Sequence, residues 1–322
     1  MTPPSSPAPR SVPVSVIVPT KNEERNLREC LASLQWASEV FVVDSRSTDR
    51  TSAIAAELGA QLVPFDYDGG WPKKKNWAIR NLPHRHEWLL IVDADERVSE
   101  ALAREIAAAV AHPEADGYYV RWKFVFLGRW MRWCWRHGWM LRLFRKGRGE
   151  YEDLGMRGEG GWDNEVHENI VVEGATQRLQ ELLLHESRED VAFWIAKQNQ
   201  FSTWNALRRV RGAASPAPLR DAFARDPLRR RKALKRLYLS LPAKPLFTFL
   251  WLYVARCGFL DGAAGYRFCL LRACHEAITD AKVMEARQRA PQSGDAAPDS
   301  LSPPRPSGPA ARGETPAADR TS

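Results

Sequence analysis

The stretch LLIVDADERVSE, residues 89–100, places three carboxylates directly after a run of four apolar residues. The apolar run predicts a buried strand, and Asp93 and Asp95 follow where that strand ends. Two carboxylates spaced in this way can point to one side of the segment, which suits a hard divalent cation that also takes phosphate oxygens. The alternative is a surface turn whose acids, Glu96 among them, start the next helix or orient the loop.

Short apolar runs alternate with amphipathic runs on both sides of this stretch. We expect strands at residues 14–19, 39–44, 60–64 and 88–92, and helices at residues 23–34, 51–58, 72–82 and 99–112. Ser99 should cap the last helix. Pro72 should open the third, because proline is tolerated at the first helical position. The alternation predicts an α/β fold with a mostly parallel, Rossmann-like sheet flanked by helices.

Beyond residue 112 the pattern changes. Residues 118–126 and 139–146 read as strands of a mixed sheet, and a shorter apolar run covers residues 179–187. The chain reads helical from about residue 189, with a break near 212–218 and further helices from about 228 to 288. No internal repeat is visible.

Polar residues also follow the other expected strands. They occur in VSVIVPTKNEE (14–24), in VVDSRSTDRT (42–51) and in GGWPKKKNWAI (69–79). Ligands of open α/β sheets bind at the carboxyl ends of the strands, so Asp44 is a candidate contact, or else a helix cap. The lysines 73–75 could face a diphosphate near a helix start; a solvated lysine run is the equal alternative.

Taken together, these stretches resemble the nucleotide-diphosphosugar-binding half of inverting family 2 glycosyltransferases, which have the GT-A fold. The resemblance covers residue 14 to about residue 112. It implies a divalent cation, Mg²⁺ or Mn²⁺, with Asp95 as the expected ligand. The residues that it implies for nucleotide-sugar binding are Pro19, Lys21, Glu23, Asp44, Ser45, Lys75 and Asp93. Arg46 departs from the pattern, because a glycine is common at this position of the DSxSTD turn.

The second half is similar to bacterial lipopolysaccharide core glycosyltransferases, especially the β-1,4-glucosyltransferase type. The similarity lies in RLFRKGRGEY (142–151), NEVHENIVVEG (164–174) and the run from 182 to 206. It implies that Glu168 is the catalytic base, with Glu165 as the second candidate because the usual acidic pair appears as His-Glu. His185 is implied as a possible metal ligand; the alternative is a satisfied core or edge histidine.

A tryptophan-rich stretch, GRWMRWCWRHGWMLRLFRK (128–146), interleaves aromatic rings with arginines. Such rings stack on sugars or lie at membrane interfaces, while arginines pair with phosphates. In a strand, however, half of these rings would simply belong to the core. The stretch therefore supports an anionic glycan acceptor without identifying any single tryptophan.

The net charge of +8 is concentrated in residues 205–256, which hold thirteen Lys or Arg against two Asp. The run LFTFLWLYVA within this region is too short for the roughly 20 residues that span a bilayer. We expect a helix pair at the anionic inner leaflet, with a buried helix hairpin as the alternative. The predicted division is a disordered terminus 1–12, a catalytic domain 13–206 (nucleotide-sugar half 13–112, acceptor half 113–206), a basic membrane-associating helical extension 207–289 and a disordered tail 290–322.

The five cysteines show no metal-binding spacing or disulfide pattern, and the N-terminus lacks a signal-peptide pattern, so a reducing cytoplasm is the expected location. The leading hypothesis is a metal-dependent inverting enzyme that moves a sugar from a UDP-sugar, UDP-glucose among them, to a lipopolysaccharide core or other lipid-linked acceptor. It would act on the inner face of the bacterial inner membrane. A sugar nucleotidyltransferase should have a glycine-rich loop after the first strand, which PTKNEE lacks, and a nucleic-acid-binding protein would leave the acids unused.

Overall fold

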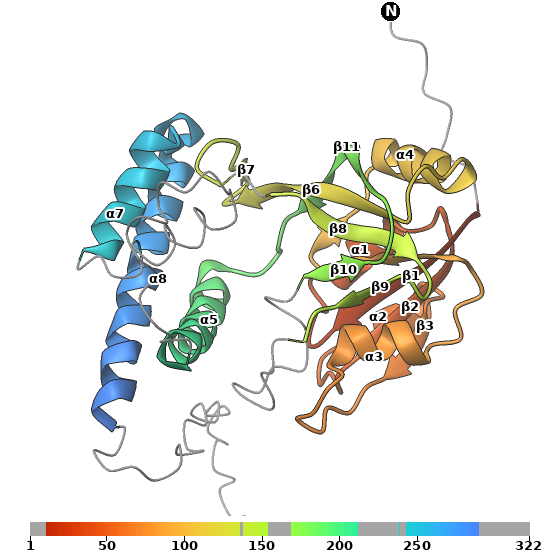
Figure 1. The fold of residues 1–322 in the computed structure, drawn as a ribbon, viewed down its shortest axis with the longest axis horizontal. Coiled ribbons are helices and arrows are strands. Elements are labelled where there is room, and N and C mark those ends of the chain that lie inside the picture. The colour runs from red at the N-terminus through yellow and green to blue at the C-terminus, as the bar shows by residue number, and fades with distance from the viewer. Residues whose placement is uncertain (1–10, 136–137, 154–168, 212–237, 239–242, 290–322) are drawn as a thin grey trace, which may run out of the picture.

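The computed structural model describes residues 11–135, 138–153, 169–211, 238 and 243–289. Its centre is a nine-stranded mixed sheet with the order β3-β2-β1-β4-β8-β6-β11-β5 and with β7 paired to β6 (Figure 1). The strands are β1 Val12–Thr20, β2 Ala37–Asp44, β3 Gln61–Pro64, β4 Trp88–Ile91, β5 Glu96–Arg97, β6 Gly117–Phe126, β7 Arg129–Trp130, β8 Met140–Arg145 and β11 Thr176–His185. A separate antiparallel pair joins β9 Gly149–Tyr151 to β10 Ile170–Val172.

The half of the sheet built from the first four strands is parallel. In the register of these strands, Ile17 lies between Phe41 and Ile91, and Thr20 lies opposite Asp44. β8 then runs antiparallel to both β4 and β6, while β11 runs parallel to β6. The predicted mostly parallel sheet flanked by helices is therefore confirmed, and its parallel half brings the carboxyl ends of β1, β2 and β4 to one edge.

Helices cover both faces of the parallel half because alternate strand residues point to opposite sides. The helices are α1 Leu27–Ala32, α2 Thr51–Glu57, α3 Lys74–Asn81 and α4 Glu100–Ala111. One core cluster joins the β1 valines to Leu31, Ile54 and Ile106, and thus to α1, α2 and α4. The other joins Ile17 and Ile91 to Ile79 of α3.

Two predicted helix starts have different outcomes. Ser99 caps α4 as predicted, because its hydroxyl accepts a hydrogen bond from the amide of Leu102 at 3.1 Å. Pro72 does not open α3, and this prediction was wrong. The helix begins at Lys74, Lys73 is its N-cap, and Pro72 follows a cis peptide bond two residues earlier.

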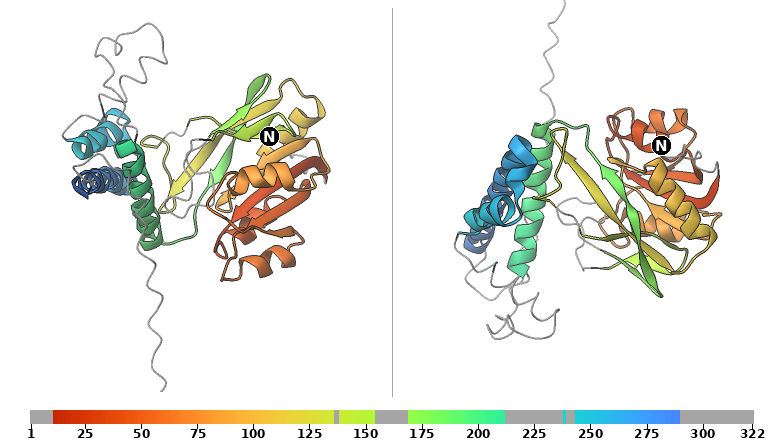
Figure 2. Two further views of the ribbon diagram at one scale, coloured as in Figure 1. Left: turned by 60° about the horizontal axis from the view of Figure 1, so that its bottom comes forward. Right: turned by 90° about the horizontal axis from the view of Figure 1, so that it is seen from above.

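The C-terminal helices form a second group beside the sheet (Figures 1 and 2). They are α5 Val191–Arg211, α7 Lys244–Leu250, the π-helix η3 Trp251–Ala255, the 3-10 helix η4 Gly258–Asp261 and α8 Gly262–Arg289. The predicted boundary after residue 206 lies inside α5, and the division into domains stays a prediction. The termini predicted to be disordered lie largely outside the described residues.

Within the described part of the chain, no single helix has the length and apolar character needed to cross a bilayer. The helix pair Lys244–Ala255 and Gly258–Arg289 satisfies these criteria only when both helices are counted together. The bend between the two helices is 74°.

Candidate active site

Asp44 occupies the carboxyl end of β2 and organises the turn that follows. The residue is 4% exposed, and its carboxylate accepts hydrogen bonds from the Thr20 hydroxyl at 2.9 Å and from the Ser47 amide at 2.8 Å. It does not cap α2, whose first residue is instead held by the side chain of Asp49. The buried Asp44 therefore shapes the rim of the predicted base and ribose pocket.

Arg46, the departure from the glycine pattern, adopts φ of +54°. This is the left-handed conformation that glycine adopts without strain, so the turn keeps the backbone course that a glycine would give it. The guanidinium pairs with the exposed carboxylate of Asp66 at 2.5 Å. The substitution thus costs some backbone strain but does not reroute the turn.

The other predicted nucleotide-binding residues of the first two strands differ in exposure. Pro19 is buried within β1 opposite Val43, Lys21 is exposed, and Glu23 is half-buried. Ser45 is buried, and among the described residues its hydroxyl has no hydrogen-bond partner.

Asp93, whose side chain is 26% exposed, joins a cluster of otherwise buried charges. Its carboxylate receives Lys75 Nζ at 2.8 Å and Arg142 Nη2 at 2.9 Å. Arg142 also donates to Glu96 Oε1 at 2.6 Å, and Glu96 Oε2 accepts the Asp93 amide at 2.8 Å. Burial alone would raise the pKa of Asp93, but the two cations hold that pKa well below its usual range. The ion pairs keep these two acids and two bases charged, and together with the bond to the Asp93 amide they fix the conformation of the loop.

Burial excludes two alternatives that the sequence left open: a solvated lysine run at residues 73–75 and a surface turn at the three acids. Lys73, Lys74 and Lys75 are all at least 96% buried, so the solvated alternative is wrong. Lys74 donates to the carbonyl of Thr20 at 2.7 Å. Glu96 is fully buried and orients the loop, so the stretch is not a surface turn.

Asp95 faces His185, whose Nδ1 is equally close to Glu96 Oε1 of the cluster, at 3.8 Å. Its Oδ1 lies 3.8 Å from His185 Nδ1, and the Asp95 side chain is 13% exposed. Nδ1 is buried and has no hydrogen-bond partner among the described residues. The imidazole packs against Trp122, with ring centroids 4.5 Å apart. Burial lowers the pKa of His185, but the charges of Asp95 and Glu96 outweigh it and raise that pKa.

Asp95 and His185 fit a divalent cation chemically. A carboxylate oxygen and an unpaired imidazole nitrogen are ligands that Mn²⁺ accepts, and Mg²⁺ sites complete their shell with water and phosphate oxygens. Within the described ranges no three or more His, Cys, Asp or Glu side chains form a site that could hold a metal ion. A cation held by Asp95 and His185 would therefore need further ligands besides these two side chains, such as the oxygens of a diphosphate.

A further charged residue, Lys197, belongs to the site. The positive charge of Lys197, from α5, is stabilised by Asp95 and Glu23, which raise its pKa despite burial. Segment 186–189 ties this side of the site together, because the Glu186 amide donates to the Asp95 carbonyl at 3.1 Å and Arg25 pairs with Glu189 at 3.2 Å. Sequence reasoning singled out neither Lys197 nor Arg142, since their partners come from distant segments. Glu165 and Glu168, the predicted bases, lie outside the described residues.

The pKa of Glu23 gives a prediction for stability. Burial and the charge of Asp95 raise this pKa from 4.5 to about 7. The folded state therefore binds the proton more tightly than the unfolded state, so Glu23 favours folding fully below pH 4.5 and loses this contribution as the pH rises through 7. We expect Glu23→Gln to raise the free energy of unfolding by about 1–3 kcal/mol at about pH 8 and to change it little at about pH 5.

Urea unfolding at both pH values measures this difference. Glutamine keeps the oxygen that accepts the Asn26 amide at 2.8 Å, so the change removes the titration and little else. Glu181→Gln, at an exposed position of β11, is the matched control, and its effect on the free energy of unfolding should not depend on pH. An equal effect of Glu23→Gln at both pH values would contradict the assignment.

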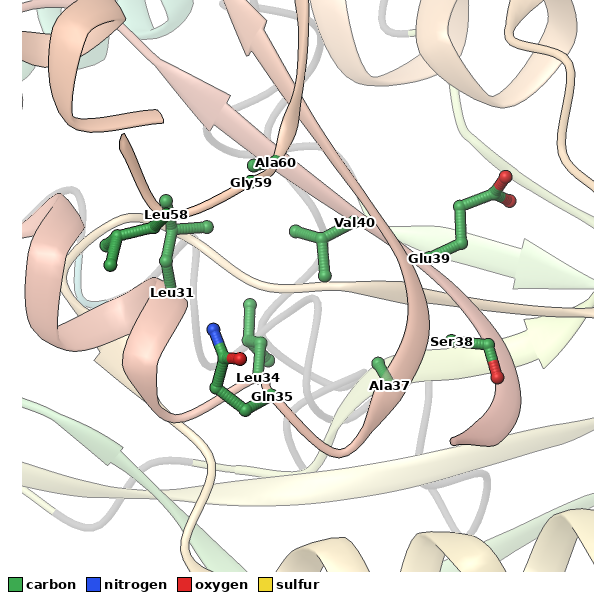
Figure 3. Close-up of a pocket in the computed structure, with 10 residues that line it drawn as sticks. All are labelled: Leu31, Leu34, Gln35, Ala37, Ser38, Glu39, Val40, Leu58, Gly59 and Ala60. Atoms are coloured by element: carbon green, nitrogen blue, oxygen red, sulfur yellow. The ribbon is translucent and has the colours of Figure 1, made fainter. Parts of the chain in front are cut away.

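A shallow pocket of about 130 Å³ lies at the opposite edge of the sheet (Figure 3). It is lined by residues 37–40 at the amino end of β2 and by the ends of α1 and α2. Its acid, Glu39, is already bound by Ser15 at 2.5 Å and by Arg85 at 2.8 Å. Because ligands of such sheets bind at the carboxyl edge, this pocket is not the candidate site.

The chain is similar to known glycosyltransferases. Residues 15–161 match the family model described as glycosyl transferase family 2. The lipopolysaccharide core biosynthesis glycosyltransferase LpsC of Rhizobium meliloti (strain 1021) is 28% identical over 298 residues, which cover 85% of this chain and 93% of that protein. An uncharacterized glycosyltransferase of Rickettsia bellii (strain RML369-C) is 37% identical over 33% of this chain and 35% of its own length.

Among solved structures, S. aureus TarS 1–349 in complex with UDP-GlcNAc aligns with a TM-score of 0.45 and 17% identity, over 85% of this chain and 91% of that chain. The matched family segment contains all the strand ends that carry Asp44, Asp93 and Asp95. The match of residues 15–161 to this family model and the similarity to LpsC confirm the predicted enzyme class, a glycosyltransferase. Together with the mostly parallel sheet flanked by helices, they also confirm the predicted fold class.

Proposed function

We propose that this enzyme transfers a sugar from a UDP-sugar, with UDP-glucose as one candidate donor, to the lipopolysaccharide core or another lipid-linked glycan, with inversion at the anomeric carbon. The observation that carries the proposal is the pair Asp95 and His185, whose facing atoms are 3.8 Å apart beside an Asp93 already neutralised by Lys75 and Arg142. The neutralised cluster leaves Asp95 as the acid available to a cation at the sheet edge.

In the proposed reaction, Asp44, Ser45 and the segment from Pro19 to Glu23 bind the base and ribose. Asp93 and Lys75 line the diphosphate side, and Asp95 and His185 would hold Mg²⁺ or Mn²⁺. When bound, the cation neutralises the charge that develops on the leaving diphosphate. Glu168, or alternatively Glu165, takes the proton of the acceptor hydroxyl. The acceptor oxygen then forms the new glycosidic bond to the anomeric carbon as the bond from that carbon to UDP breaks.

The proposed acceptor rests on two observations. LpsC, which is similar over most of both chains, is named for lipopolysaccharide core biosynthesis. Half-buried Trp139, directly before β8, also contacts two arginines: Arg121 of β6 and Arg178 of β11 lie over its ring at 4.7 and 5.2 Å from the centroid. Such a surface suits a phosphorylated glycan. An acceptor of this kind places the enzyme on the cytoplasmic side, at the inner face of the bacterial inner membrane.

The experiment is an assay of UDP release from a panel of UDP-sugars, with and without a lipopolysaccharide precursor. We expect release to depend on Mn²⁺ or Mg²⁺, to stop with EDTA and to recover when the metal is restored. Formation of a UDP-sugar from UTP and a sugar phosphate would instead indicate a nucleotidyltransferase. Metal-independent binding of nucleic acid, with no UDP release from any donor, would overturn the proposal.

A further inference from the structure

An exposed apolar surface is built from two segments far apart in the sequence. Leu127 is 53% and Trp130 36% exposed at the β6–β7 hairpin, while Phe259 and Leu260 of η4 are 48% and 47% exposed. We call these four side chains the docking surface. In Figure 1 the hairpin lies beside the junction of α7 and α8, where η4 is located.

The two segments of the docking surface are held together rigidly. The buried carboxylate of Asp261 accepts the consecutive amides of Arg132, Trp133 and Cys134 at 2.8–3.2 Å. Arg129 also donates to the carbonyl of Leu260 at 3.3 Å. A core cluster of its own, with Met131 and Phe268 among its members, lies beneath the hairpin. The apolar side chains are therefore presented in one fixed arrangement.

Positive charge surrounds the docking surface. No Asp or Glu occurs between Asp116 and Glu150, so the hairpin carries only bases. Lys123 and Arg132 are exposed and lie over the ring of Trp130, each 5.5 Å from its centroid. The nearby acid, Asp261, is 2% exposed and already bound by backbone amides. Apolar tips among exposed bases are complementary to an anionic lipid surface.

The position of the docking surface relative to the active site is set by β6. Phe124 of this strand contacts His185, with ring centroids 5.4 Å apart. Leu127 follows three residues later, which corresponds to about 10 Å along an extended strand. A bilayer in contact with the hairpin would therefore lie within the reach of a glycan whose hydroxyl is at the site.

We propose that the docking surface inserts into the headgroup region of an anionic phospholipid bilayer and so holds the active site at the height of a lipid-anchored acceptor. The role of the bilayer in presenting the acceptor rests on the proposed function; the binding to lipid does not. The apolar side chains would enter the boundary between headgroups and acyl chains, and the surrounding lysine and arginines would pair with lipid phosphates.

The test is sedimentation of the full chain with vesicles of phosphatidylcholine alone and of phosphatidylcholine with phosphatidylglycerol. We expect binding to the anionic vesicles only, weakened by high salt. The double variant Leu127→Asp, Leu260→Asp should lower the partition coefficient by about tenfold for each leucine. Leu127 already has φ of +50°, a conformation that Asp tolerates, so folding should not suffer.

Leu62→Asp, at a 40% exposed position of β3, is the matched control and should bind vesicles like the wild type. Equal binding by the double variant, equal binding to neutral vesicles, or a dimer in solution that the double variant dissociates would overturn the proposal. UDP release without vesicles should be the same in all these proteins. If release is absent throughout while the vesicle results are as expected, the proposed function fails and the docking stands.

Discussion

Asp95→Asn should lower the rate of UDP release by about 100- to 1000-fold, which is the usual cost of removing one group that stabilises transition-state charge. The amide keeps the size of the side chain but has no negative charge with which to hold a cation. Among the described residues, the closest ion-pair partner of the Asp95 carboxylate is His185, at 3.8 Å. Loss of the Asp95 charge weakens its attraction to Lys197 and His185 but also relieves its repulsion of Glu23, so the thermal midpoint should stay near that of the wild type.

Two measurements separate a loss of metal from a loss of fold. Calorimetric titration with Mn²⁺ and UDP should show weaker binding of the metal–nucleotide complex, while circular dichroism stays unchanged. Asp280→Asn, on α8 and paired with Arg209 at 2.9 Å and Lys244 at 3.1 Å, is the matched control and should retain full activity. Full activity of Asp95→Asn would show that this carboxylate holds no essential cation.

The sequence predicted the parallel half of the sheet because each strand there is a short apolar run followed by polar residues. The strands found at Val12–Thr20, Ala37–Asp44 and Trp88–Ile91 match those expectations within a few residues. For the same reason Asp44, Asp93 and Asp95 could be assigned to one edge. Those predictions needed only local periodicity and the rule that parallel strands end together.

The order of the remaining strands could not be predicted in this way. Periodicity indicates that residues 140–145 form a strand, but not that β8 inserts antiparallel between β4 and β6. That insertion is what brings Arg142 to Asp93 and Glu96, which precede it by 49 and 46 residues. A buried arginine in a strand looks the same in sequence as an exposed one. Likewise, the burial of Lys73, Lys74 and Lys75 depends on contacts that no local pattern of a lysine run reveals.

Arg142→Met should be the most destabilising of the changes considered, with a loss of about 3–5 kcal/mol in the free energy of unfolding. Arg142 is 5% exposed and joins both acids of the loop, at 2.9 Å to Asp93 and 2.6 Å to Glu96. Removal of its charge leaves Glu96, which is fully buried, without its 2.6 Å ion pair and with only the imidazole of His185, at 3.8 Å, as a possible cationic neighbour. Methionine fills much of the same volume, so the loss measures charge rather than a cavity.

Urea unfolding of a small set of variants tests this explanation. Arg145→Met, at the other arginine of β8, is the matched control. The Arg145 side chain is 25% exposed and pairs with Glu87 and Asp116, so its loss should cost only about 0–1 kcal/mol in the free energy of unfolding. Glu96→Gln combined with Arg142→Met should recover part of the loss, because it removes the carboxylate that has lost its ion pair while an oxygen remains for the Asp93 amide. If the double variant is no more stable than Arg142→Met alone, the cost does not come from the buried charge of Glu96. The lost contact between the guanidinium and the ring of Trp122, 5.5 Å from guanidinium carbon to ring centroid, would then be the explanation to test.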